Sequence, residues 1–163
     1  MIAFALLLTA APAQPSTAPA PPPQTATVVA DVVQAMLPHA LQQFAARCRA
    51  GLPADAYLAR NGQRLADRLQ PAADAAWPRA LPVLTQARSA VITPGATDAQ
   101  KKAELFSSFD KDVVGSMTPD QCRTLDGLLE PLDPLPPENL SRFVARLVST
   151  LMLGGPNGAP LPH

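Results

Sequence analysis

Apolar residues recur at helical spacing through the middle of the chain. From Thr27 onward they fall in pairs four residues apart, which places them on one broad face of a helix. Pro38 lies inside this pattern and is expected to bend the helix, because its ring meets the carbonyl group of residue 34. Gly51 ends the pattern. The buried face of this first predicted helix comprises Val28, Val29, Val32, Val33, Met36, Leu37, Ala40, Leu41, Phe44 and Ala45.

The following stretch has weaker patterns that prolines interrupt. Pro53 stands where a first-turn proline is typical, and it predicts a second helix from Pro53 to Leu69. Pro71 opens a third segment, which Pro78 and Pro82 are expected to break into short turns. The core positions expected in this third segment are Trp77, Leu81, Val83 and Leu84.

The second half of the chain has clearer helix signals. Thr97 with Gln100, and Thr118 with Gln121, have the spacing of capping boxes, in which the two side chains satisfy free amides of the first turn. They predict helices over residues 98–114 and 119–129. A sixth helix has the most regular apolar pattern, formed by Leu140, Phe143, Val144, Leu147, Val148, Leu151 and Met152.

The pattern as a whole predicts an all-α domain, a small bundle of five or six helices over residues 27–153. Runs of alternating β-branched and polar residues are nearly absent, so strands are not expected. The total of 163 residues suits one domain. Residues 154–163 combine glycine and proline and are expected to form a disordered tail.

The N-terminal residues predict export. Residues 2–12 form an apolar run that is shorter than a membrane-spanning helix but typical of a signal peptide, with cleavage expected after Ala13. No Lys or Arg precedes the run, and a buried N-terminal helix is the alternative. Residues 14–26 then form a proline-rich linker. We therefore expect a periplasmic or secreted protein with no transmembrane segment in the mature chain.

Two cysteines, Cys48 and Cys122, lie on different predicted helices. An even number of cysteines in an exported chain favours a disulfide bond, while free thiols or a metal site are the alternatives. Many of the apolar residues are alanines, which bury little area each. A bridge between Cys48 and Cys122 would therefore stabilise this core, by about 4 kcal/mol for so long a loop.

Residues 110–121 resemble the calcium loop of the EF-hand family. Counted from Asp110, acidic residues occupy positions one and three and Gly115 occupies position six. Position five is Val114 and position twelve is Gln121, where the family has oxygen ligands. The resemblance implies a degenerate calcium-responsive site, and the alternative is a helix that ends near Gly115 and a capped restart. The ligands would be Asp110, Asp112, Ser116 and Asp120.

Three arginines at intervals of four, Arg60, Arg64 and Arg68, form a stripe on the second predicted helix. Such a stripe could contact an anion or an acidic partner. The alternative is an ordinary solvated face, since long arginine side chains often lie over apolar surface with their charged ends in water. Arg142 and Arg146 repeat this spacing near the C-terminus.

Charge and catalytic motifs narrow the functional classes. Thirteen basic and thirteen acidic side chains give no net charge, which argues against a nucleic-acid partner or membrane binding through bulk charge. No phosphate-binding glycine loop and no hydrolase motif occurs, and no cofactor is expected. His39, with Asp31 on nearly the same face, supports only a weaker hydrolase hypothesis. The sequence thus predicts a non-enzymatic, exported binding module whose partner is an envelope protein or ligand.

Overall fold

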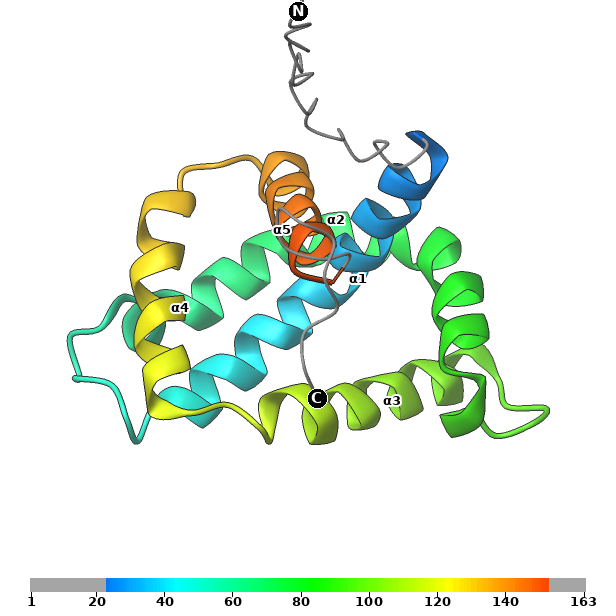
Figure 1. The fold of residues 1–163 in the computed structure, drawn as a ribbon, viewed down its shortest axis with the longest axis horizontal. Helices are drawn as coiled ribbons and strands as arrows, with labels where there is room; N and C mark the ends of the chain where they lie inside the picture. The colour runs from blue at the N-terminus through cyan, green and yellow to red at the C-terminus, as the bar shows by residue number, and fades with distance from the viewer. Residues whose placement is uncertain (1–22, 153–163) are drawn as a thin grey trace, which may run out of the picture.

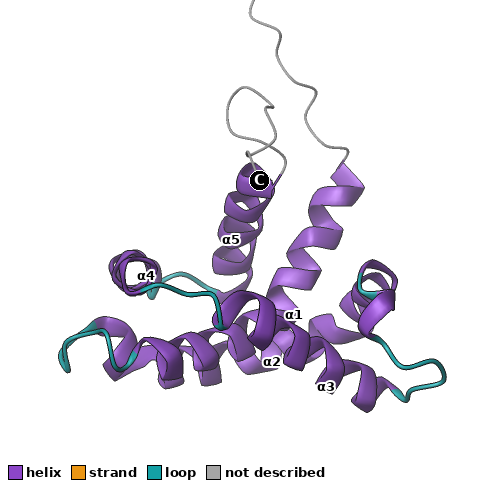
Figure 2. Ribbon diagram, turned by 60° about the horizontal axis from the view of Figure 1, so that its bottom comes forward, coloured by secondary structure: helices purple, strands orange, loops and turns teal. Residues whose placement is uncertain are grey.

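The computed structural model describes residues 23–152, which form five α-helices and no strands (Figures 1 and 2). The predicted all-α class is therefore confirmed. The predicted signal peptide, most of the predicted linker and the predicted tail lie outside the described residues. None of the described helices is long and apolar enough to cross a membrane. The helices are α1 (Pro23–Cys48), α2 (Tyr57–Ala87), α3 (Asp98–Phe109), α4 (Pro119–Leu132) and α5 (Pro137–Met152).

Helices α1 and α2 form the centre of the bundle and run antiparallel. The side chain of Gln34 donates to the carbonyl oxygen of Ala72 at 3.0 Å, and Arg79 forms two hydrogen bonds with Asp31. Toward the other end of the pair, the two backbones approach closely at Gly62. A Cβ atom at this position would lie 2.9 Å from the Cβ of Ala45, so a residue without a side chain is required for this spacing. Helix α1 begins at Pro23, inside the segment predicted as linker.

The prediction of two separate segments between residues 53 and 87 was wrong, because α2 is one helix of 31 residues. Its prolines at 71, 78 and 82 all lie on the exposed side, where water can hydrate the carbonyl groups that lose their amide partners. The opposite side is rich in alanine, with Ala73, Ala76 and Ala80 fully buried. Close packing of these alanines holds the helix together while the prolines bend it, and Figure 1 shows the resulting change of direction.

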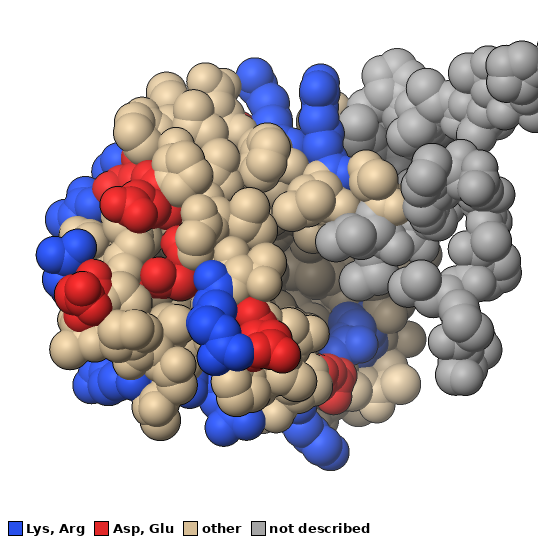
Figure 3. All heavy atoms as spheres, turned by 60° about the vertical axis from the view of Figure 1, so that its left-hand side comes forward, with Lys and Arg blue, Asp and Glu red and all other residues tan. Residues whose placement is uncertain are grey.

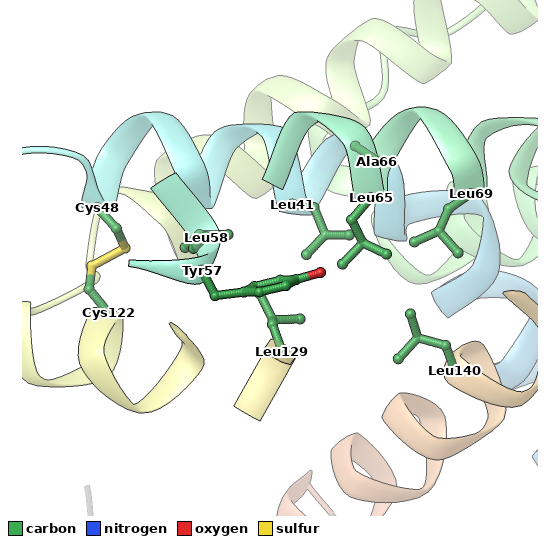
Figure 4. Close-up of a cluster of buried hydrophobic side chains, with 10 residues drawn as sticks. All are labelled: Leu41, Cys48, Tyr57, Leu58, Leu65, Ala66, Leu69, Cys122, Leu129 and Leu140. Carbon is green, nitrogen blue, oxygen red and sulfur yellow. A yellow bond between two sulfur atoms is a disulfide. The ribbon is translucent and has the colours of Figure 1, made fainter. Parts of the chain in front are cut away.

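The larger hydrophobic cluster lies between the first half of α2, the second half of α1, and α4 and α5. It contains Leu41, Leu58, Leu65, Leu69, Leu129 and Leu140 (Figure 4). A smaller cluster joins Ala35 of α1 to Ala76, Trp77 and Ala80 of the second half of α2. The use of alanine in the second cluster agrees with the weakly packed core that the composition predicted.

The predicted disulfide bond is present. Cys48, the last residue of α1, is bonded to Cys122 in α4, with 5.5 Å between their Cα atoms and a sequence separation of 74. Both side chains lie inside the larger cluster. Near the bridge, the carboxylate of Asp126 in α4 accepts a 2.6 Å hydrogen bond from the amide of Leu58, whose helix has no side-chain cap of its own. Helix α4 is therefore joined to the end of α1 by a covalent bond and to the beginning of α2 by a remote cap.

The two predicted capping boxes are confirmed, and α3 and α4 begin at the expected residues, Asp98 and Pro119. Helix α3 continues into a short π-helix, η2 (Asp110–Val114), so residues 98–114 form one helical run as predicted.

Helix α5 buries only part of the face that its apolar pattern predicted, since Leu140 is buried and Val144 packs against the larger cluster. Leu140, Ser141 and Ala145 are buried, whereas Phe143 and Leu147 are 44% and 41% exposed. The buried Ser141 hydroxyl donates to the carbonyl oxygen of Pro137, which allows a polar residue at this contact. Small residues at positions 141 and 145 let α5 approach α1 closely, and the wide apolar stripe is left partly uncovered.

Candidate functional site

An open groove lies between the second half of α2 and the beginning of α3. Two adjoining hollows of about 610 and 380 Å³ form it, and they share three residues. Pro78, Leu81 and Pro82 project from α2 on one side, and Asp98, Lys101 and Lys102 project from α3 on the other. The remaining lining residues are Asp74, Trp77, Thr85, Gln86, Ser89 and Ala99.

The shape of the groove follows from the bend in α2. Each proline removes one amide donor, and side chains supply donors nearby: Gln34 to the carbonyl oxygen of Ala72 and Arg79 to that of Ala75. A 3-10 helix, η1 (Ser89–Val91), and a turn with Gly95 at a φ of 79° then bring the chain back to begin α3. The capping box at Thr97 fixes the first turn of α3, so that Asp98 and Lys101 face the groove.

The inner wall of the groove includes one aromatic ring, that of Trp77, which packs on Phe106 behind it. Trp77 is 8% exposed, and its ring lies edge-on to Phe106 of α3 with 5.4 Å between the ring centroids. The ammonium group of Lys102 lies 4.5 Å from the centroid of the Trp77 ring, a cation–π contact. Lys101 forms an ion pair with Asp98 at 3.0 Å. The groove thus combines an apolar wall with a charged rim, the composition typical of a binding site.

His39 lies behind this wall and contacts it through Phe106. The imidazole ring stacks on Phe106 with 3.9 Å between centroids, and its Nε2 atom donates to Asp110 Oδ1 at 2.8 Å. Asp31, the partner that the hydrolase hypothesis required, is instead bonded to Arg79. Within the described part of the chain, no hydroxyl or thiol group hydrogen-bonds to the His39 ring. This geometry makes His39 a packing and bridging residue between α1 and α3.

The EF-hand-like segment does not form a loop, because residues 110–114 are helical. Its side chains contact different partners: Asp110 contacts His39, Asp112 contacts Arg88, and Asp120 contacts Arg123. The hydroxyl of Ser116 donates to the carbonyl oxygen of Val113. Residues 23–152 contain no group of three or more His, Cys, Asp or Glu side chains that could hold a metal ion. The four proposed ligands are therefore not brought together.

The arginine stripe is mostly occupied by contacts within the molecule. Arg64 and Arg68 both bind Asp133, at the end of α4, and Arg60 has no ion-pair partner among the described residues. Basic and acidic side chains intermingle on this side of the molecule and form no large patch of one sign (Figure 3). Of the three arginines, Arg60 is therefore the one that remains available to an anion.

Tyr57 lies against the same carboxylate. Its buried hydroxyl makes no hydrogen bond of good geometry, but burial and the neighbouring Asp133 carboxylate raise the pKa of Tyr57 to about 12. Burial by itself would raise the pKa of Asp133, yet the Tyr57 hydroxyl and the two guanidinium groups outweigh it and lower that pKa. These interactions of Asp133 with Tyr57 and the two arginines therefore join α2 to the end of α4 electrostatically.

The groove was not predicted from the sequence. Trp77 was correctly placed in the core, but Pro78 and Pro82 were interpreted as helix breaks. Pro78 and Pro82 are four residues apart and so share one side of a helix, while Ala76 and Ala80 share the opposite side. This spacing is the signal that indicates one bent helix with prolines on its outer side.

Comparisons with known proteins give no match: no family model, no curated protein and no solved structure matches this chain. The functional interpretation therefore depends on the geometry of the molecule itself.

Proposed function

We propose that this chain is a non-enzymatic binding module of the cell envelope, periplasmic or secreted, that holds an extended peptide segment in the groove between α2 and α3. The observation that carries the proposal is the apolar wall of Trp77, Leu81 and Pro82 opposite a charged rim, in which Lys101 is paired with Asp98 and Lys102 lies over Trp77. An extended segment can lay apolar side chains along such a wall, while carboxylate or carbonyl oxygens meet the rim.

The hydroxyl of Thr85 adds a possible polar contact for a bound segment. Thr85 lines the groove, and its Oγ1 atom is buried without a hydrogen-bond partner among the described residues. A buried hydroxyl without a partner is costly, and a small shift of its rotamer would let it bond a peptide backbone. Thr85 and the two lysines would then fix the position and direction of the segment.

The disulfide bond supports a location outside the cytoplasm. Disulfides persist in oxidising compartments and are rare where glutathione and thioredoxin keep thiols reduced. The bridge between Cys48 and Cys122 lies in the core, and the apolar leader predicted for residues 2–12 would direct the chain across the membrane. Counting thiols under denaturing conditions in protein from the exported fraction tests this part. We expect no free cysteine, and two reactive thiols would contradict it.

Photo-crosslinking tests the groove directly. A photoreactive phenylalanine at Gln86, which lines the groove, is compared with the same residue at Gln63, an exposed position on the first half of α2. We expect one discrete covalent adduct in the envelope fraction for position 86 and none for position 63. Adducts of equal yield at both positions, or none at position 86, would contradict binding in the groove.

The fluorescence of Trp77 gives an independent measurement, because it is the single tryptophan of the chain. A peptide identified from the adduct should shift the emission of Trp77 on titration. Replacing Thr85 by Val should weaken this binding while the fold is kept, since the two side chains have nearly the same shape and Val lacks the hydroxyl. Equal affinity of both variants would remove Thr85 from the site.

A further inference from the structure

The exposed side of α5 combines two apolar and two basic side chains. Arg142 and Arg146 are exposed, and Phe143 and Leu147 are 44% and 41% exposed. These positions are i, i+1, i+4 and i+5 of one helix, so all four lie within about 140° of its circumference. The side chains therefore form one continuous strip along α5.

The two arginines of this strip differ from most others in the molecule. Arg64, Arg68, Arg79, Arg88 and Arg123 each form an ion pair with an aspartate. Arg142 and Arg146 have no such partner within residues 23–152, and the single acidic residue of α5 is Glu138, in its first turn. Glu138 lies one turn before Arg142, so α5 keeps a net positive charge beside this exposed apolar surface.

Helix α5 is also placed at the edge of the molecule. It packs mainly on α1, and Figure 2 shows α5 and the first part of α1 rising from the layer that α2 and α3 form. The strip lies on the side of α5 that this packing leaves uncovered, so a large flat surface can approach it.

We infer that this strip binds the surface of an anionic lipid membrane. Phe143 and Leu147 would enter the boundary between head groups and acyl chains, and the guanidinium groups of Arg142 and Arg146 would contact lipid phosphates. This inference goes beyond the groove: it assigns a second surface, which would hold the module against the membrane while the groove binds its ligand.

The size of the strip favours lipid over a protein partner. The strip spans six residues of α5, about 9 Å, and its exposed side is about 10 Å wide, which gives about 90 Å². A stable protein interface buries about 800 Å² on each partner. A lipid surface needs no complementary shape, and it supplies many phosphates at once, so a narrow strip suffices.

Vesicle sedimentation tests the inference. The full oxidised chain is mixed with vesicles of phosphatidylglycerol and phosphatidylcholine, or of phosphatidylcholine alone, and the bound fraction gives a partition coefficient. We expect binding to the anionic vesicles that weakens with added salt, because salt screens the charges. Replacing both Arg142 and Arg146 by Gln should lower the partition coefficient about 25-fold, since each basic residue contributes about fivefold.

Matched variants distinguish binding by the strip from a general effect of the protein's charge. Replacing Arg49 and Arg60 by Gln removes the same charge from two exposed arginines that have no ion-pair partner in the described range, and it should leave partitioning unchanged. Replacing Phe143 and Leu147 by Ser should lower partitioning about tenfold. The same change at Val91 and Val113, which are similarly exposed, should not. All variants have the same N-terminal residues, so differences in their partition coefficients come from the substituted positions.

Three results would overturn the inference. The first is absence of binding to anionic vesicles. The second is an equal loss for the α5 variants and their matched controls. The third is that native envelope vesicles bind the protein, protease treatment of these vesicles abolishes the binding, and pure lipid vesicles bind nothing. This result would assign the strip to a protein partner. Because the strip and the groove share no residue, these results leave the crosslinking test of the groove unaffected.

Discussion

Asp133 is the acceptor that connects α2 to the end of α4. Arg64 binds its side chain, and Arg68 donates to its backbone carbonyl oxygen and pairs with its carboxylate. Because these contacts favour the ionised form, the pKa of Asp133 is lowered in the folded protein. A lowered pKa stabilises the fold above the carboxyl's ordinary pKa, and this contribution is lost as pH falls through the lower, folded value.

We therefore predict that Asp133→Asn lowers the melting temperature at pH 7. The difference from the wild type should shrink as the pH falls below about 4, where the wild-type carboxylate also becomes protonated. Asp120→Asn is the matched control, because Asp120 is 84% exposed and pairs only with its neighbour Arg123. Thermal melts from pH 2 to pH 7 measure both variants. A penalty for Asp133→Asn that stays constant across this range would contradict the electrostatic role.

Tyr57 gives a prediction at the opposite end of the pH scale. Its pKa is raised to about 12, so the unfolded chain ionises at pH 10 while the folded chain stays neutral. Its contribution to stability is present below pH 10 and is lost as the pH rises to 12. We expect an alkaline loss of about 2 kcal/mol in the free energy of unfolding that is absent in Tyr57→Phe. Urea unfolding at pH 8, 10 and 11.5 measures it, and parallel curves for both proteins would contradict it.

The sequence identified some of these residues and misassigned others. Two cysteines, together with a predicted export signal, sufficed to predict the bridge between Cys48 and Cys122. Arg64 and Arg68 were assigned to a possible anion site, because Asp133 lies 65 or more residues away in sequence and becomes their neighbour only after folding. Local spacing predicts which side chains share a helix face, but it does not predict which other element that face contacts.

At the scale of single helices, local signals determined the starts of α3 and α4, whereas tertiary packing determined the length of α2 and the buried faces. The capping boxes located the starts of α3 and α4, because the bonds that form them lie within four residues. The continuity of α2 depends on alanines that pack against α1, a contact that no local pattern contains. The groove was missed for the same reason, since it exists only where α2 bends toward α3.

Two glycines test how closely α1 and α2 must approach. Gly62→Ala would place a Cβ atom 2.9 Å from the Cβ of Ala45, so we expect a loss of about 1–3 kcal/mol in the free energy of unfolding. Gly127→Ala, on the exposed side of α4, meets nothing within 4 Å and should gain about 0.5–1 kcal/mol from helix propensity. Urea unfolding compares the two. Stabilisation of both variants would contradict the close contact between α1 and α2 at Gly62.

At the scale of the whole molecule, the disulfide bond stabilises a core that is built partly from alanine. Three of the four buried residues of the smaller cluster are alanines, and each alanine buries little apolar area. The bridge joins α1 to α4 across 74 residues and so restricts the unfolded chain strongly. The fold class and the bridge were both predictable, because helix periodicity and cysteine number do not depend on the arrangement of the helices.

We predict that replacing both Cys48 and Cys122 by Ala lowers the free energy of unfolding by about 4 kcal/mol, because the chain entropy of the unfolded state increases. Reduction of the wild type in urea should reproduce this loss, since it opens the same loop. If the bridge acts only by holding α4 in place to cap α2, the loss should be about 1–3 kcal/mol. It should then overlap with the loss for Asp126→Ala, which removes the remote cap on Leu58. The triple variant decides between the two effects. Additive losses indicate that the bridge acts on the unfolded chain as a whole. A triple variant no less stable than the double variant would show that the bridge acts only by positioning α4 to cap α2.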